Sequence, residues 1–371
     1  MASDLLSTPP PLAPPKTWDA TVSWLRLIRS HRVGPTTFFR LLAEHGTAEA
    51  ALQALPAIAG KAGVAKYAPF SAKAAEQELK IGKRIGATLV CYGAAGYPAL
   101  LAEITDPPPL MWAIGDVSLT ERPAIALVGA RNASSLGTRM ATSLATGLGE
   151  AGFTIASGLA RGIDTAAHLA TLDTGTVAIQ AGGVDVTYPK ENAALHDQIA
   201  KSGLRLSEQP LGMEPIARHF PRRNRIISGM SRAVVVVEAA AKSGSLITAR
   251  EALDQGRDVL AVPGHPFDAR AAGCNMLIRD GAALVRSSKD ILEALAKPQP
   301  KAAPKTPRKR PVHNAGPAHA QILGLLGPTP VAEDQLIRDL DVHPDLVTPQ
   351  LLALELEGKI TRQAGGLLSR L

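Results

Sequence analysis

Short apolar stretches alternate with segments of helical pattern from about residue 86 to residue 296, and this alternation constrains the fold more than any other feature. A run such as Ala233–Val237, rich in β-branched residues, is typical of a strand buried on both faces of a parallel sheet. The predicted strands are Ile125–Val128, Phe153–Ala156, Val177–Gln180, Leu204–Ser207, Val234–Glu238, Val259–Val262 and Ala283–Val285. The sequence therefore predicts an α/β domain with a parallel sheet and helices on both faces.

Smaller modules are predicted on both sides of this sheet domain. Residues 17–85 show apolar positions at helical spacing, and glycine-containing turns at His31–Pro35 and Leu55–Gly60 are expected to join helices, as in SAM-like or helix-hairpin-helix modules. Residues 317–371 outline a winged helix. Its helices are predicted at Ala318–Leu326, Val331–Leu340 and Pro344–Glu357, and its β-wing from Ile360 to Leu368.

The composition between the modules completes the predicted organisation. Residues 1–16 are rich in proline and are expected to form a disordered tail, and residues 297–316 carry six bases and no acid, which is typical of a flexible basic linker. We therefore predict five segments: 1–16, 17–85, 86–296, 297–316 and 317–371.

Several classes of protein are disfavoured by composition. The sequence contains neither a membrane span nor the basic-then-apolar pattern of a signal peptide, so a cytoplasmic location is expected. Its two cysteines, Cys91 and Cys274, form neither a CxxC motif nor a Cys/His cluster. Disulfide frameworks and structural zinc are therefore not expected.

Positive charge is concentrated rather than spread through the sheet domain. Residues 86–296 carry nineteen bases and twenty acids, yet five arginines and no acid lie between Pro215 and Val237. Four of these arginines surround Phe220 and Asn224. Guanidinium groups bind phosphate oxygens and stack on bases, and a phenyl ring can carry a base with little sequence preference. We interpret the stretch 217–227 as a loop anchored to the following strand and able to bind anions.

Three other loops are predicted at the carboxyl ends of strands, where open α/β sheets bind ligands. Residues 129–137 and 242–249 combine small residues with the start of a helix, which predicts amide-lined anion cradles. Residues 157–164 form the third loop, in which Asp164 is placed to cap the helix that carries His168. These two side chains suit either capping with a local hydrogen bond or an acid–base pair.

No motif for catalysis accompanies these loops. The sequence lacks GxGxxG, a Walker A loop, a GxSxG elbow and HExxH, so we expect no catalytic residue, no metal and no cofactor. The absence of a catalytic set favours a binding protein over an enzyme.

A family resemblance is carried by a series of motifs in residues 88–292. They are Val128–Arg131, Ser157–Asp164, Tyr188–Pro189, Ser207–Glu208, Phe220–Ser228, Ser243–Ala249 and Pro263–Gly264. In this order and spacing the chain resembles the DNA-processing protein A (DprA/Smf) family. The resemblance implies an extended Rossmann-like core that binds single-stranded DNA without marked sequence preference.

Partners and site residues also follow from the resemblance. It implies protection of incoming strands and loading of the recombinase RecA in natural transformation, usually as a homodimer through the Rossmann-like domain, and no enzymatic activity. Many relatives have a lysine where this chain has Ala217, and Arg218 is the expected substitute. The predicted DNA-binding residues are Gly129, Arg131, Asn132, Ser157, Gly158, Arg161, Arg218, Phe220, Arg222, Arg223, Asn224, Arg225, Lys242, Ser243 and Ser245.

Two other functions stay open. Rossmann-like proteins of the lysine-decarboxylase-like group cleave nucleoside monophosphates, and Ser243–Ser245 stands where they carry a GGxGT-type loop. The winged helix suggests a regulator that binds duplex DNA, but its third predicted helix has no Lys or Arg. For that module we favour an interaction with protein.

Overall fold

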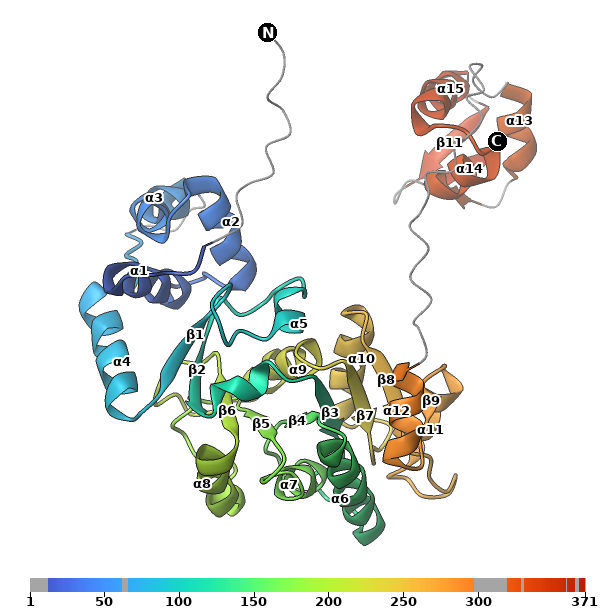
Figure 1. The fold of residues 1–371 in the computed structure, drawn as a ribbon. Helices are drawn as coiled ribbons and strands as arrows, with labels where there is room; N and C mark the ends of the chain where they lie inside the picture. The colour runs from blue at the N-terminus through green and yellow to red at the C-terminus, as the bar shows by residue number, and fades with distance from the viewer. Residues whose placement is uncertain are drawn as a thin grey trace. The chain divides into compact units, whose positions relative to one another are not determined.

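The computed structural model describes residues 13–61, 66–296, 319–327, 330–357, 359–363 and 367–370. The chain forms two compact units that separate between residues 297 and 298 (Figure 1). Residues 1–12 of the predicted tail and the whole predicted linker lie outside the described residues, and the five segment boundaries stay predictions. Within the described ranges, none of the helices combines the length and apolar composition that a membrane crossing requires.

The first unit is built on a sheet that has nine strands among the described residues, in the order β1-β2-β6-β5-β4-β3-β7-β8-β9. The strands from β6 to β9 in this order are parallel. The chain winds outward from β3 to β6 and then returns to β7 on the other side of β3. The strands are β1 (Thr88–Cys91), β2 (Leu110–Gly115), β3 (Ala124–Val128), β4 (Thr154–Ser157), β5 (Thr176–Ile179), β6 (Leu204–Ser207), β7 (Ala233–Val236), β8 (Asp258–Ala261) and β9 (Ala283–Leu284).

Helices cover both faces of this sheet. One face packs against α5 (Ala99–Ala102), α9 (His219–Gly229), α10 (Ser245–Asp254) and α11 (Ala272–Arg279). The other face packs against α6 (Ser135–Glu150), α7 (Ile163–Leu169), α8 (Ala193–Ser202) and α12 (Ser288–Ala296). Two short 3-10 helices, Val117–Thr120 and Lys190–Asn192, lie between these elements.

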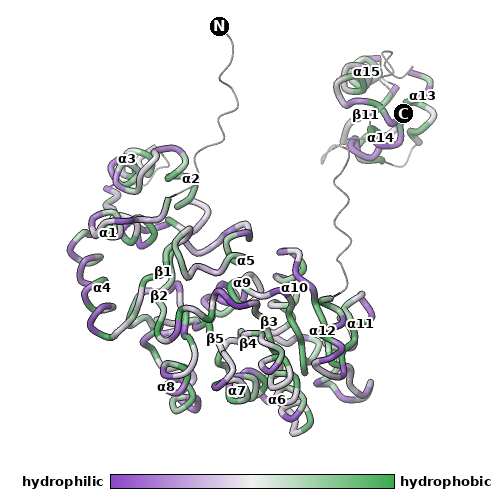
Figure 2. The backbone as a smooth tube through the Cα atoms, in the orientation of Figure 1, coloured by the Kyte–Doolittle hydropathy of each residue, from purple (hydrophilic) through white to green (hydrophobic). Residues whose placement is uncertain are grey.

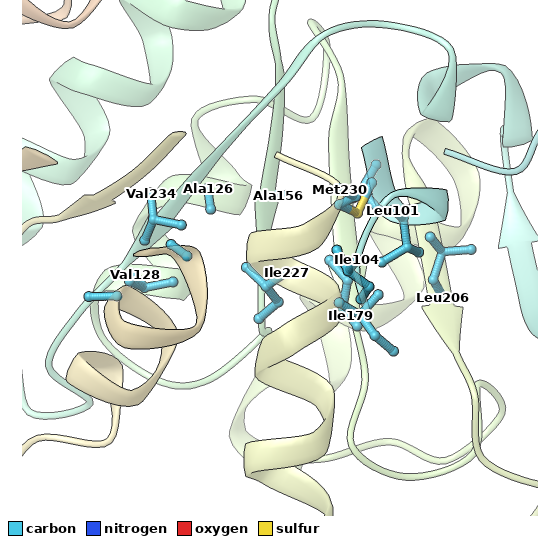
Figure 3. Packing of buried hydrophobic residues seen from close by; sticks show 14 of the residues in the cluster. Leu101, Ile104, Ala126, Val128, Ala156, Ile179, Leu206, Ile227, Met230 and Val234 are labelled. Carbon is cyan, nitrogen blue, oxygen red and sulfur yellow. The ribbon is translucent and has the colours of Figure 1, made fainter. Parts of the chain in front are cut away.

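The helix α9 shows how the pattern of the sequence creates the core. Its residue Ile227, and Met230 directly after the helix, point into a cluster with Ala126 and Ile179 of the sheet and Ile104 beyond α5 (Figure 3). The strands β3 and β7 contain only apolar residues, while the outer helices alternate in hydropathy (Figure 2). This is the arrangement expected of strands buried on both faces.

The predicted fold class is confirmed, and the seven predicted strands are present with ends shifted by one or two residues. The sequence-based prediction missed β1 and β2, which are antiparallel to each other, and β2 is antiparallel to β6. The strand β2 reads Leu-Met-Trp-Ala-Ile-Gly after three prolines, a composition with one β-branched residue, so β-propensity gave little signal. The sheet is therefore mixed at this edge rather than wholly parallel.

The N-terminal helices are α1 (Trp18–Arg29), α2 (Pro35–His45), α3 (Ala48–Lys61) and α4 (Ala72–Arg84). Their core, around Leu25, Phe38 and Leu41, also includes Trp112 of β2. The turn at His31–Pro35 joins α1 to α2 as predicted. The second predicted turn is wrong, because Leu55–Gly60 lies inside α3 with Pro56 in the helix interior. A proline and a glycine in one short stretch are normally signs of a break, but here burial of the helix outweighs them.

The second unit has the three predicted helices, α13 (His319–Leu325), α14 (Glu333–Leu340) and α15 (Pro344–Leu356), and the predicted wing, β11 (Ile360–Gln363) and β12 (Leu367–Arg370). One part of this prediction is wrong, because Val331–Ala332, predicted as the start of a helix, forms the short strand β10. The core includes Leu336, Val347, Leu351 and Leu354, and β12 pairs with both β10 and β11.

Candidate nucleic-acid interface

A groove of about 790 Å³ lies at the carboxyl edge of the sheet, where β3 and β7 are neighbours. This is the point at which the winding direction of the sheet reverses, the usual ligand position in open α/β folds. The loop after β3 and the loop after β7 form its floor, and the first turn of α9 forms one side. Residues with polar or aromatic side chains that line it are Arg131, Asn132, Asp164, Phe220, Arg223, Asn224, Lys242, Ser243, Ser245, Thr248 and Arg270.

An aromatic and cationic ridge bounds the groove. The guanidinium carbon of Arg131 lies 5.2 Å from the centre of the Phe220 ring, and the ring of Tyr188 lies 5.6 Å from that of Phe220. A second hollow, of about 500 Å³, lies across the ridge and shares Arg131 and Phe220 with the groove. We call Arg131, Tyr188, Phe220 and Lys242 the groove wall. Such a wall presents stacking faces and positive charge together.

The stretch that carries Phe220 is a helix rather than the predicted loop. Helix α9 begins at His219, so Pro221 stands in its first turn, where a missing N–H costs no intrahelical hydrogen bond. The helical period then separates the arginines. Arg218 and Arg222 are exposed but do not line either hollow, whereas Arg223 and Arg225 are buried. Arginines that are adjacent in the sequence therefore differ in role, because two face solvent and two hydrogen-bond inside the protein.

Arg223 supports the floor of the groove from below. Its guanidinium donates to the carbonyl of Gly158 and, at 2.6 Å, to that of Ile179. A side chain on Gly158 would overlap this guanidinium, since a Cβ there would lie 2.0 Å from Nη1. Burial lowers the pKa of Arg223 to about 10, so the group stays charged at neutral pH.

Asp164 and His168 hold the loop that follows β4. The Asp164 carboxylate accepts from the amides of Gly158 (3.0 Å) and Ala160 (3.3 Å), and burial raises its pKa against the opposing effect of Arg223. Nε2 of His168 accepts from the amide of Leu159 at 3.2 Å. The predicted capping role is corrected, because Gly162 is the N-cap and Asp164 lies in the first turn. Both side chains thus hydrogen-bond to local backbone amides, as expected of residues that hold a loop and not of a catalytic acid–base pair.

Two predicted DNA-binding side chains are held away from the groove. Arg225 donates to the Asp106 carbonyl at 2.7 Å and forms an ion pair with Glu208, and Ser157 donates to the Leu127 carbonyl at 2.6 Å. Their hydrogen-bonding capacity is used inside the protein. We call Asp164, His168, Glu208, Arg223 and Arg225 the buried polar framework.

The two predicted anion cradles differ. At the start of α10, Gly244 is the N-cap without a side-chain cap, and the hydroxyls of Ser243 and Ser245 lie 2.7 Å apart beside exposed Lys242. At the start of α6, Ser134 instead donates to an internal carboxylate, that of Glu238. The loop after β3 still contributes Gly129, Arg131 and Asn132 to the groove.

Some groove residues were missed from the sequence. Tyr188 and Lys190 line the second hollow together with the predicted Gly158 and Arg161, and Arg270 lines the groove. Arg161 is paired with Glu191 at 3.2 Å. The loop 263–270 carries no basic run, so its sequence gave no charge signal. Among the described residues, no group of three His, Cys, Asp or Glu side chains is placed to hold a metal ion.

Comparison with known families agrees with this architecture. Residues 88–296 match the family model described as DNA recombination-mediator protein A. The chain belongs to this family. The flanking residues 19–80 and 297–366 match models of a DprA-like N-terminal HHH domain and a DprA winged helix domain. The resemblance predicted from the motifs is thus confirmed, and the chain has the domain composition of a recombination mediator.

Individual members of the recombination-mediator family are similar to the chain in sequence. The DNA processing protein DprA of Streptococcus pneumoniae is 47% identical over 198 residues, which cover 53% of this chain and 70% of the relative. The protein Smf of a Synechocystis species is 36% identical over 304 residues, which cover 72% of this chain and 76% of the relative.

Two solved structures share the fold. That of DNA processing protein A from Streptococcus pneumoniae has a TM-score of 0.55 and 35% identity, and covers 70% of this chain and 98% of that one. That of DNA processing protein A from Helicobacter pylori, a protein with a single-stranded DNA binding mode, has a TM-score of 0.52 and 27% identity. It covers 56% of this chain and 95% of that one.

Proposed function

We propose that the groove binds single-stranded DNA without marked sequence preference. The observation that carries the proposal is the contact of the Phe220 ring with Arg131, whose guanidinium carbon lies 5.2 Å from the ring centre, and with the ring of Tyr188. Every base has a face that can stack on an aromatic ring, and the guanidinium of Arg131 can bind a backbone phosphate. The ring of Phe220 and the cation of Arg131 can therefore bind a strand of any sequence. The single-stranded DNA binding mode of the Helicobacter pylori relative supports the same function.

The start of α10 supplies the second element of the proposed site. Lys242 is exposed and lines the groove, and no ion pair within the described ranges includes it. The hydroxyls of Ser243 and Ser245 line the groove and can donate to phosphate oxygens, while the amides of Ser245, Leu246 and Ile247 donate within the loop and the first turn of α10. In this arrangement, the bases of the strand stack on the groove wall and its phosphates bind at the start of α10.

A strand-binding titration tests this proposal. Fluorescence anisotropy would compare labelled oligo-dT, a duplex of the same length and AMP across a series of salt concentrations. We expect oligo-dT to bind most tightly, with a log–log salt slope of about 0.7 for each phosphate contacted. Equal affinity for the duplex, or a salt-independent affinity for oligo-dT, would refute the proposal.

The AMP measurement addresses the alternative of a nucleotide-processing enzyme. Nothing in the groove favours that activity over strand binding. If AMP bound as tightly as oligo-dT and free adenine appeared during incubation, the alternative would replace the proposed function.

Family membership supports a wider role in recombination. We propose that the protein acts in the cytoplasm as a homodimer that protects single strands and loads RecA onto them during natural transformation. A RecA ATPase assay on oligonucleotide coated with single-strand-binding protein tests the loading. ATPase activity should begin sooner when this protein is added, and an unchanged lag would contradict RecA loading.

For the winged-helix unit we propose a protein-binding role. Residues 317–371 carry seven acids and four bases, an unfavourable balance for phosphate contact. A chain ending at residue 316, which keeps the six bases of residues 297–316, should therefore bind a duplex no more weakly than the full chain. A clear loss of duplex affinity on truncation would instead support the duplex-regulator alternative.

A further inference from the structure

Glu238 follows β7 and places its carboxylate at the start of α6. The carboxylate accepts from the Ser134 amide at 3.0 and 3.3 Å and from the Ser134 hydroxyl at 3.0 Å. Its side chain is only 8% exposed. A nearly buried carboxylate needs partners of this kind, since an unpaired one carries a large desolvation cost.

The start of α6 is shaped around this carboxylate. A Cβ on Gly137 would lie 1.8 Å from Oε2 of Glu238, so a side chain at that position would displace the carboxylate. Helix α6 has sixteen residues, and the N-terminus of such a helix attracts negative charge. In open α/β folds, this helix start after a central strand is a common position for a ligand phosphate. The carboxylate of Glu238 therefore occupies, at the start of α6, the position where other folds of this class bind a ligand phosphate.

The surroundings of Glu238 would otherwise suit a phosphate. A hollow of about 630 Å³ adjoins it and is lined by Ser134, Arg139, His265 and Arg286. Asp268 also lines it, and its carboxylate is paired with Arg270 at 3.2 Å. Arg139 is exposed, while Arg286 is paired with Asp290 at 3.1 Å. The hollow thus combines a helix N-terminus, hydroxyl groups and cations, and the carboxylate of Glu238 lies within it.

Glu238 also connects this hollow with the groove. Nε of Arg270 lies 3.4 Å from the Glu238 carboxylate and 3.2 Å from that of Asp268, and Arg270 itself lines the groove. The side chain of Arg270 is 49% exposed, so its ion pairs chiefly fix its position. Glu238 thereby holds one cation of the groove in position.

We propose that Glu238 determines which anions this sheet edge accepts. Its carboxylate takes the place of a ligand phosphate at α6, which leaves α10 as the phosphate-binding helix start, and it positions Arg270 for the strand. The protein thereby accepts a polymer in the groove and rejects a free nucleotide or phosphate at the position that this fold commonly offers. The inference deepens the proposed function and rests on it for the role of Arg270, but the exclusion of phosphate is independent of DNA.

Thermal unfolding in increasing inorganic phosphate tests the exclusion, with sodium chloride at matched ionic strength as the reference. Wild type sets the baseline, which includes phosphate bound at α10 and the general stabilising effect of phosphate as a salt. Glu238→Ala should show a rise in Tm about 3–6 °C larger than that of wild type at ten times its Kd for phosphate at α6, because only the folded state would bind the ion. Glu238→Asp, which keeps a carboxylate near α6, is the matched control and should resemble wild type.

Each outcome decides the proposal. A phosphate-specific rise in wild type or in Glu238→Asp equal to that in Glu238→Ala would overturn it, as would no rise in Glu238→Ala. If Glu238→Ala does not fold in chloride, recovery of its folded circular-dichroism spectrum in phosphate supports the proposal, and failure to recover overturns it.

A parallel oligo-dT titration separates this proposal from the proposed function. Glu238→Ala should lose on the order of two- to fivefold in oligo-dT affinity through Arg270, the scale of an exposed ion pair. If wild type bound no oligo-dT while the phosphate results held, the proposed function would fail and the anion exclusion would stand. If wild type bound oligo-dT but Glu238→Ala showed no phosphate-specific rise in Tm beyond that of wild type, the proposed function would stand and the anion exclusion would fail.

Discussion

The groove wall and the buried polar framework both contain arginines, but these arginines differ in what they contact. Arg131 is exposed and lies against a ring, whereas Arg223 is buried and donates to two backbone carbonyls. Burial decides the role of each. A substitution in the wall should therefore change binding with little effect on folding, and a substitution in the framework should change folding first.

The largest expected effect is in the framework. Arg225→Ala removes the cation that pairs with Glu208 and leaves that carboxylate without its ion-pair partner. Loss of one partner from a buried ion pair costs about 3 kcal/mol of unfolding free energy, measured by urea denaturation. Arg222→Ala, an exposed position on the same helix, is the matched control and should change it by less than about 0.5 kcal/mol. Equal effects would remove the distinction between the two arginines.

A pH effect should come from His168. Burial lowers its pKa from 6.5 to about 3, so below pH 6.5 the unfolded chain takes up a proton that the folded chain does not. Stability is then lost as pH falls from about 6.5 towards 3, by about 1.4 kcal/mol per unit for this group. Urea denaturation between pH 7.5 and pH 5 measures it, and His168→Gln should flatten the profile. An unchanged profile in His168→Gln would assign the acid sensitivity to other groups.

In the groove wall, Phe220→Ala should weaken oligo-dT binding at least tenfold and leave unfolding unchanged. The loss of stacking accounts for about 1–3 kcal/mol per base. Anisotropy gives the affinity and urea denaturation gives the stability. Phe220→Tyr keeps an aromatic face and should bind nearly as wild type. Wild-type affinity in Phe220→Ala would place Phe220 outside the site.

The smallest expected effect is that of a single phosphate contact. Lys242→Ala should reduce the log–log salt slope of oligo-dT binding by about 0.7, because one fewer counterion equivalent is released. Lys201→Ala, on α8 and outside the groove, should leave the slope unchanged. A reduced slope in both variants would indicate a general charge effect instead of a contact at α10.

Most of the sheet could be predicted because strands buried on both faces have a strong local signature. Ala233–Val236 is apolar throughout, and the three loops predicted at strand ends follow the parallel strands β3, β4 and β7. The strand β2 could not be predicted in this way, since its pairing with β6 depends on residues about 90 positions away rather than on local composition.

The sequence predicted where the candidate site lies in the fold, but it predicted only some of the side chains that line it. Charge and the motif order located the groove, yet the pattern alone cannot say that Arg222 faces solvent and Arg223 the interior, which follows from the helical period once α9 is known. The pairing of Glu238 with Ser134 spans 104 residues and leaves no local signal. Contacts of that kind arise from the topology of the sheet.

The central claim is that a single strand stacks on the ring at position 220. The most direct measurement is tryptophan fluorescence of Phe220→Trp during titration with oligo-dT, with the signal of the three native tryptophans subtracted. Leu169→Trp is the control, since Leu169 is exposed at the end of α7 away from the groove. The account predicts saturable quenching in Phe220→Trp and none in Leu169→Trp. Binding of oligo-dT without quenching in Phe220→Trp would contradict it.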